Sequence, residues 1–214
     1  MRSSFLVVGA TLLSAFVASA TDFPTAEAFL GYNFVRFNPN SGYAPSFNAN
    51  GGSGQIIYNF NKWVGGVFDM GAVTKGTLNQ INVDSTVMNF VAGPRFTWFN
   101  HSRFLPYANV MFGGAYSTFS APVAVPAGVP LPGPFIVLNP NLDPFSARVV
   151  TSHTGFAMMA GGGLDIKLSK HIAFRPIGAD YYLTRLSSNL TGGVTNRNNF
   201  RYSAGVTFLF GGAK

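Results

Sequence analysis

The chain of 214 residues contains no cysteine, only 10% charged residues and 47% hydrophobic residues, and its formal net charge is +7. The lack of cysteine excludes a disulfide-stabilised exported domain and a lipoprotein, because each requires a thiol. The basic residues are scattered singly along the chain, whereas nucleic-acid binding requires a basic stripe or patch, so a nucleic-acid partner is excluded. Soluble domains usually contain about a quarter charged residues, so this composition favours an outer surface that faces lipid.

The first twenty residues have the pattern of a secretory signal peptide. Arg2 supplies a basic start, residues 5–18 form an apolar run, and residues 18–20 read Ala-Ser-Ala, a small-x-small cleavage site. A membrane-anchoring helix is the alternative, but the run is shorter than the ~20 apolar residues that a bilayer requires. We therefore expect residues 1–20 to be removed and residues 21–214 to form one outer-membrane β-barrel domain. Loss of Arg2 lowers the net charge from +7 to +6.

The rest of the chain is divided into segments in which apolar and polar residues alternate, bounded by clusters of Gly, Asn and Pro. The connections after the second, fourth and sixth segments are tight, whereas the others are long and polar or proline-rich. Outer-membrane barrels have this asymmetry, with short periplasmic turns, long external loops and an even number of strands. The eight expected strands are residues 25–37, 52–60, 63–73, 86–99, 103–119, 154–168, 171–186 and 199–210.

The last strand shows the alternation most strictly. Its apolar positions are Phe200, Tyr202, Ala204, Val206, Phe208 and Phe210, and they alternate with Arg201, Ser203, Gly205, Thr207 and Leu209. In a soluble barrel such as a lipocalin the apolar face would point inward, and alternation alone does not exclude that arrangement. However, the opposite faces of several strands combine small residues with a few charges, which suits the narrow interior of an eight-stranded barrel.

Aromatic residues gather near both ends of the expected strands, as two interfacial girdles would require. Near the tight turns lie Trp63, Trp98, Phe99, Phe104, Tyr107 and Phe174, and toward the loops lie Tyr43, Tyr116, Phe119, Tyr181 and Tyr182. The sequence therefore predicts an all-β fold, an eight-stranded antiparallel transmembrane β-barrel with up-and-down topology.

Five stretches carry a family resemblance through their order and spacing. They are residues 27–40 (EAFLGYNFVRFNPN), 60–65 (FNKWVG), 93–96 (GPRF), 161–186 (GGGLDIKLSKHIAFRPIGADYYLTRL) and 198–211 (NNFRYSAGVTFLFG). Together they resemble the small porin-family proteins of Gram-negative bacteria, which are similar to the membrane-embedded barrel of outer membrane protein A. The resemblance covers nearly the whole expected mature chain.

This resemblance implies a location in the cell outer membrane and insertion by the barrel-assembly machinery, which recognises an aromatic-rich final strand. Phe208 and Phe210 would carry that assembly signal. The chain departs from the family pattern by continuing past Phe210 as Gly-Gly-Ala-Lys. We also expect no peptidoglycan-binding domain, and hence no tether to the cell wall.

Charged residues within the strands are expected to face the lumen, because a charge on the lipid face costs about 2–4 kcal/mol at the bilayer midplane. Strict alternation would place Arg175 and Asp180 on opposite faces. A bulge at Pro176 would shift the register, so that Ile177, Ala179, Tyr181 and Leu183 point outward and Asp180 points inward. The expected lumenal charges are Glu27, Asp69, Arg95, Asp165, Lys167, Arg175, Asp180 and Arg201. They could form a paired structural network or line a gated ion path.

The remaining candidate residues give little indication of a metal site or of an enzyme. The histidines His101, His153 and His171 have no ligand spacing, so neither a metal site nor a cofactor is expected. Ser152-His153 could suggest a lipid-modifying barrel, but no acid lies at a suitable spacing. Residues 121–145 are rich in proline, which we expect to prevent ladder pairing. Their apolar side chains could contact an external partner, or the loop could simply be mobile.

These observations predict a non-enzymatic integral outer-membrane protein with surface-exposed loops and a structural or adhesive role. Two alternatives stay open at this point. One is a narrow, low-conductance pore for small solutes, and the other is a membrane-embedded lipid-modifying enzyme. The expected partners are outer-membrane lipid, the barrel-assembly machinery during insertion, and an external partner of loop 121–145.

Overall fold

The computed structural model describes residues 22–38, 46–76, 84–100, 102–125, 135–137, 145–187 and 194–211. The expected signal peptide (residues 1–20), Tyr43 and His101 lie outside these ranges. Within them, no helix is long and apolar enough to cross a membrane.

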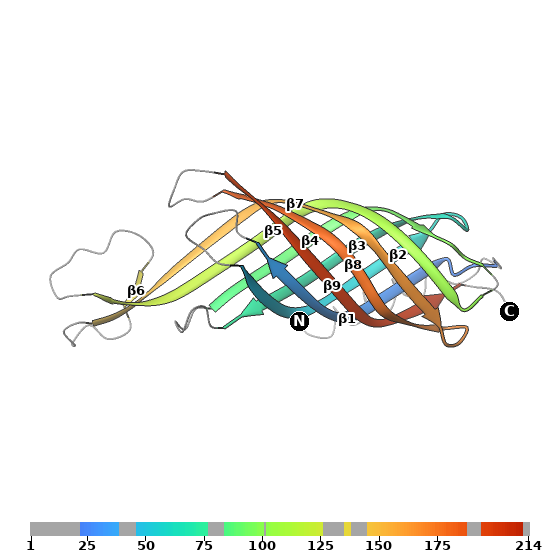
Figure 1. The fold of residues 1–214 in the computed structure, drawn as a ribbon, viewed down its shortest axis with the longest axis horizontal. Helices are drawn as coiled ribbons and strands as arrows, with labels where there is room; N and C mark the ends of the chain where they lie inside the picture. Colours follow the sequence, from blue (N-terminus) through green and yellow to red (C-terminus); the bar gives the residue numbers. More distant parts are fainter. Residues whose placement is uncertain are drawn as a thin grey trace, which may run out of the picture.

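The described chain folds into a closed antiparallel β-barrel (Figure 1). Consecutive barrel strands pair with each other, β5 pairs with β7, and the first strand pairs with the last, which closes the barrel with eight strands. The short strand β6 pairs only with β7 and lies outside the barrel wall. The strands are β1 (Ala26–Phe37), β2 (Phe47–Asn59), β3 (Val64–Lys75), β4 (Asp84–Thr97), β5 (Phe104–Val125), β6 (Phe135–Val137), β7 (Phe145–Lys167), β8 (Ile172–Ser187) and β9 (Val194–Phe210). The predicted eight-stranded antiparallel barrel is thus confirmed.

The apolar face of the strands points outward. On β9, Phe200 and Tyr202 are 44% and 45% exposed, whereas Arg201 between them is 1% exposed. The same arrangement holds on β4, where Phe90 and Phe96 are exposed and Arg95 is buried. A water-soluble barrel would bury the apolar face, so the lipocalin-like alternative is wrong and the outer surface is built for lipid.

Part of the long loop 121–145 forms regular β-structure, contrary to the expectation that its prolines prevent ladder pairing. Strand β5 continues to Val125, β7 begins at Phe145, and Pro122 lies opposite Arg148 in an unbroken ladder. The pairing of β4 with β5 ends at Ser120, so Pro122 has a neighbouring strand on one side only. Proline is compatible with such an edge, because its missing N–H can face the unpaired side. This long hairpin, with β6 added to it, extends beyond the other strands (Figure 1).

The aromatic girdles are confirmed in part. At the tight-turn end Trp63, Trp98, Phe104 and Phe174 are exposed, and Trp63 packs edge-on against Trp98 with ring centroids 5.9 Å apart. Toward the loops Tyr116 and Tyr181 are both 39% exposed. Tyr107 and Tyr182, however, are 6% and 1% exposed and lie inside the barrel, so their assignment to the girdles was wrong.

A layer of apolar side chains extends along the interior, from Ile57 and Val67 near the tight turns to Phe37 and Tyr182 near the loops, where the two rings pack edge-on at 6.4 Å between centroids. Polar Thr184 and Asn199 are also buried toward the loops. The apolar side chains include Val35, Phe37, Ala49, Val73, Val87, Met111, Ala115, Ala157, Met159 and Tyr182. The charged residues lie nearer the tight-turn end and the middle. The sequence pattern predicted glycines and charges for the lumen but not this apolar layer.

Candidate functional site: a charged network in the barrel lumen

The structure places seven of the eight expected lumenal charges in the interior, with at most 3% of each residue exposed: Glu27, Asp69, Arg95, Asp165, Arg175, Asp180 and Arg201. Lys167 instead lies at the end of β7, next to a tight turn, and is partly exposed. It takes part in none of the ion pairs found among the described residues, so it is not a member of the interior network.

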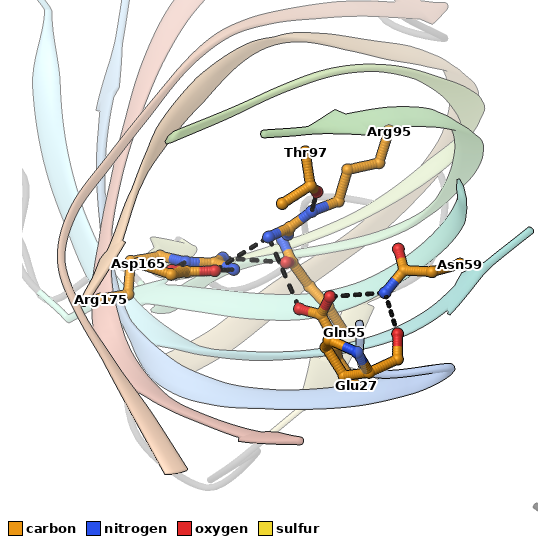
Figure 2. A network of polar contacts seen from close by, with 8 residues as sticks. Glu27, Gln55, Asn59, Arg95, Thr97, Asp165 and Arg175 are labelled. Atoms are coloured by element: carbon orange, nitrogen blue, oxygen red, sulfur yellow. Dashed lines mark hydrogen bonds and ion pairs between the residues drawn. The ribbon is translucent and has the colours of Figure 1, made fainter. Parts of the chain in front are cut away.

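One cluster of charges is centred on Asp165. Arg175 binds its carboxylate at two points, with Nε donating to Oδ1 at 2.7 Å and Nη2 donating to Oδ2 at 3.1 Å. Arg95 Nη2 donates to the same Oδ2 at 2.9 Å (Figure 2). Glu27 Oε2 lies 3.7 Å from Arg95 Nη2, while its Oε1 accepts a hydrogen bond from Asn59 at 2.7 Å. We call these residues the Asp165 cluster.

Tyr107 lies between the two guanidinium groups of this cluster. Its ring centroid is 3.8 Å from Arg95 Cζ and 4.4 Å from Arg175 Cζ, and Arg175 also stacks on Phe29 at 3.9 Å. Stacking on aromatic faces favours a guanidinium, which is planar and weakly hydrated. The arginines thus gain both carboxylate and aromatic contacts in place of water.

Two glycines leave room for the Tyr107 hydroxyl. A Cβ atom added at Gly163 or at Gly178 would lie 2.7 Å from Tyr107 Oη, closer than real Cβ contacts allow. Gly163 of β7 and Gly178 of β8 therefore accommodate a lumenal aromatic side chain. This explains why these strands need small residues on their inner faces.

A second cluster is centred on Arg201, which contacts two carboxylates. Its Nη1 donates to both oxygens of Asp69 at 2.9 and 3.0 Å, and its Nε and Nη2 donate to Asp180 Oδ2 at 3.0 and 2.8 Å. Asn89 Nδ2 also donates to Asp69 Oδ1 at 2.7 Å. We call these residues the Arg201 cluster.

Gln55 joins the two clusters. Its Oε1 accepts a hydrogen bond from Arg175 Nη1 at 2.9 Å, and its Nε2 donates to Asp69 Oδ2 at 2.8 Å. Gln55 is not among the lumenal residues expected from the sequence, although it alternates with apolar Ile56 on a strand and its inward position could have been inferred. Through Gln55 the charges form one continuous network between opposite walls of the barrel.

The predicted bulge at Pro176 is present, because the pairing of β8 with β9 shifts register between Arg175 and Gly178. Ile177 and Tyr181 point outward, and Arg175 and Asp180 are both buried. They bind different partners, however, since Arg175 pairs with Asp165 and Asp180 pairs with Arg201. The bulge thus supplies each cluster with one charge from the same strand.

The other candidate residues lie apart from this network. Phe208 and Phe210 are 38% and 36% exposed on the outer face of β9. Ser152 is exposed on β7, next to the partly exposed His153. Within the ranges that the structure describes, no group of three or more His, Cys, Asp or Glu residues could hold a metal ion.

A closed eight-stranded barrel with an apolar outer face and a charged interior defines an integral outer-membrane protein. Residues 4–208 match the family model described as the outer membrane protein beta-barrel domain, and the chain belongs to this family. The protein is therefore located in the cell outer membrane. No curated protein sequence matches the chain.

Solved structures of small barrels are similar to this fold. Neisserial surface protein A is 11% identical, with a TM-score of 0.57, and the match covers 87% of this chain and 97% of that protein. The attachment invasion locus protein Ail of Yersinia pestis is 18% identical, with a TM-score of 0.52 and coverage of 87% and 99%. A second Ail structure, in complex with the heparin analogue sucrose octasulfate, has a TM-score of 0.50 at 15% identity, covering 86% of this chain and 97% of that chain. At these identities the likeness shows the fold alone.

Proposed function

We propose that this protein is a non-enzymatic, surface-exposed outer-membrane barrel with a structural or adhesive role, and that its lumen is plugged. The observation that carries the proposal is the continuous network joined by Gln55. Three guanidinium groups and four carboxylates are held by contacts between side chains from β1, β2, β3, β4, β7, β8 and β9. Buried apolar side chains such as Met111 and Met159 support the same reading, because charged solutes would lose their hydration beside them.

Planar-bilayer conductance of the full mature chain tests the plug against the narrow pore. We expect no steady channels from the parent protein, because each charge of the network is buried and lies within 4.0 Å of a group of opposite charge. Arg201→Gln should still give no steady conductance, although it should destabilise the barrel. A wet pore would behave differently, since steady channels would appear in the parent and Arg201→Gln would alter their ion selectivity with little loss of stability. That result would overturn the plug.

The adhesive role is supported by the long hairpin of β5 and β7. It continues past the end of β4, and β6 pairs with it at Val149 to Ala147, which gives a three-stranded extension beyond the barrel. Short two-stranded ribbons are marginal on their own, so the added strand stabilises the projection. Such a projection can carry a contact surface for a host protein or a cell-surface polysaccharide. Ail, a barrel of similar fold, has been solved in complex with a heparin analogue.

Replacement of residues 121–145 by a short Gly-Ser turn tests that role. Cells that display the shortened protein should lose adhesion to epithelial cells or to immobilised heparin, while the amount of folded barrel in the outer membrane stays the same. A matched control replaces residues 188–193, in the β8–β9 connection, by the same turn. Unchanged adhesion of the shortened protein, with an intact barrel, would contradict an adhesive role for this hairpin.

The export and membrane insertion of the protein follow from its assignment as an outer-membrane barrel. We propose cleavage after residue 20, a mature domain of residues 21–214, and recognition by the barrel-assembly machinery through Phe208 and Phe210. The outward position of both side chains at the end of the last strand supports this role. The lipid-modifying enzyme is the weakest candidate, and lipid A mass spectrometry of cells with and without the protein would detect it.

A further inference from the structure

Basic residues surround the tight-turn end of the barrel. Lys62 lies in the turn between β2 and β3, Arg103 precedes β5, Lys167 ends β7, and Lys170 lies in the turn between β7 and β8. Three of these side chains are exposed and Lys167 is partly exposed. We call these four residues the basic rim. Among the described residues at this end, Asp22 is the only exposed acid.

Three members of the basic rim are close neighbours. Lys167 N donates to Arg103 O at 2.7 Å, so the two residues lie side by side on adjacent strands. Lys170 follows three residues later, in a turn closed by a hydrogen bond from Leu168 N to Ile172 O at 2.9 Å. Like charges on adjacent strands repel each other. None of the ion pairs found in the described part of the chain involves these cations, so they are available to an external anion.

The network in the lumen uses four of the seven acidic residues of the chain, which leaves few for the rim. It contains four carboxylates and three guanidinium groups, so it holds one more negative than positive charge. Without residues 1–20 the net charge of the chain is +6, since Arg2 no longer counts toward the +7 of the full sequence. The positive surplus therefore lies entirely outside the lumen, at the surfaces and ends of the barrel.

Aromatic side chains fix the depth of the basic rim in the membrane. Trp63 and Trp98 lie in the girdle at this end, and Lys62 Nζ lies 5.5 Å from the centroid of the Trp63 ring. Tryptophan residues sit at the level of the lipid headgroups. Because short turns of outer-membrane barrels face the periplasm, the rim lies among the headgroups of the periplasmic leaflet.

We propose that the basic rim binds the phosphate groups of anionic phospholipids in the periplasmic leaflet, with Arg103, Lys167 and Lys170 as the principal site. Each cation near an anionic membrane surface increases lipid binding by about fivefold, so three neighbouring cations select an anionic headgroup over a zwitterionic one. The site is separate from the network in the lumen and does not depend on whether the lumen conducts.

Tryptophan fluorescence offers a test, because the chain contains only two tryptophans and both lie at the end of the barrel that carries the basic rim, with Trp63 next to Lys62. The mature protein is folded into vesicles that contain either acyl-brominated phosphatidylglycerol or acyl-brominated phosphatidylethanolamine at equal mole fraction. Bromine atoms quench the fluorescence only of tryptophans that lie close to them. We expect the phosphatidylglycerol lipid to be enriched about fivefold or more beside the tryptophans, and this preference to fall in 0.5 M NaCl because salt screens exposed charges.

The variant Arg103→Gln/Lys167→Gln/Lys170→Gln should bring the ratio of the two lipids close to one. The control Arg36→Gln/Lys75→Gln/Arg185→Gln removes the same charge at the loop end and should keep the preference. Lys170→Gln alone, in an exposed turn, should fold normally and lose part of the preference. The proposal would be overturned if both lipids quenched the parent protein equally. It would also be overturned if the control variant lost the preference for phosphatidylglycerol as fully as the rim variant does. Full competition by millimolar inorganic phosphate would identify a site for free phosphate and overturn the assignment to lipid.

Discussion

Arg175 and Asp165 form a two-point ion pair inside the barrel, with donor–acceptor distances of 2.7 and 3.1 Å. Each residue has further partners, since Asp165 also binds Arg95, and Arg175 also binds Gln55 and stacks on Tyr107. A guanidinium paired bidentately and stacked on a ring cannot be replaced by lysine without losing contacts. Substitutions at this pair should therefore show how much the polar interior contributes to the stability of the barrel.

We expect Asp165→Asn to destabilise the folded barrel by about 3–5 kcal/mol, because it leaves Arg95 and Arg175 without their shared counter-charge in a buried site. Arg175→Gln should cost a similar amount. The double variant should recover part of the loss, since neither charge of the pair is then orphaned. Urea unfolding of the protein in lipid vesicles measures all three. Lys62→Gln, at an exposed turn, is the control and should change stability by less than about 0.5 kcal/mol.

Gln55→Leu tests the connection between the two clusters. This change leaves Arg175 Nη1 and Asp69 Oδ2 without their hydrogen bonds to Gln55, which should cost about 1–3 kcal/mol. Gln55→Glu should cost more, because its carboxylate would face Asp69, whose oxygen lies 2.8 Å from the present amide nitrogen. Urea unfolding measures the free energy of unfolding of the two variants and of the parent protein. A Glu variant as stable as the parent would show that the network has room for another negative charge, contrary to the structure.

Gly178→Ala tests the packing around Tyr107. The added methyl group would lie 2.5 Å from Ser203 Oγ and 2.7 Å from Tyr107 Oη, which should destabilise the barrel by about 1–3 kcal/mol. Tyr107→Phe combined with Gly178→Ala should recover part of this loss, because one of the two close contacts disappears. Gly114→Ala is the matched control, since its nearest contact would be 3.7 Å. Equal stability of the two alanine variants would contradict the assigned role of Gly178.

Phe210→Ala should lower the yield of folded barrel in cells, because it removes the outward aromatic side chain that ends the last strand. The folded, heat-modifiable band on a detergent gel measures the yield. Phe200→Ala removes another outward aromatic from the same strand and should have a smaller effect, and removal of residues 211–214 should matter little. If Phe200→Ala and Phe210→Ala reduce the yield equally, the signal is the general apolar face of β9 rather than its end.

The mature protein should begin at Thr21 and fractionate with the outer membrane. N-terminal sequencing of the membrane-bound form and sucrose-gradient fractionation check the two statements. A form that begins at Met1, or a soluble periplasmic product, would contradict the assignment of residues 1–20 as a signal peptide.

The alternation of the sequence, together with the small and charged residues on the opposite faces of the strands, was sufficient to determine the class of fold. A side-chain period of two is a local property of each strand, and charges among large apolar residues can be accommodated in a membrane barrel only on the inner face. Residues such as Arg95, Asp165 and Arg201 could therefore be placed in the lumen from the sequence. The register shift at Pro176 could also be predicted, because proline cannot donate a ladder hydrogen bond.

The partners inside the lumen could be decided only by the tertiary structure. Arg201 and Asp69 are 132 positions apart in the chain, and Arg175 and Gln55 are 120 apart, so closure and stagger of the barrel determine which side chains meet. The inward position of Tyr107 depends in the same way on space left by residues of neighbouring strands, Gly163 and Gly178. A pattern along one strand specifies a face, but a contact across a closed barrel depends on the positions of all eight strands.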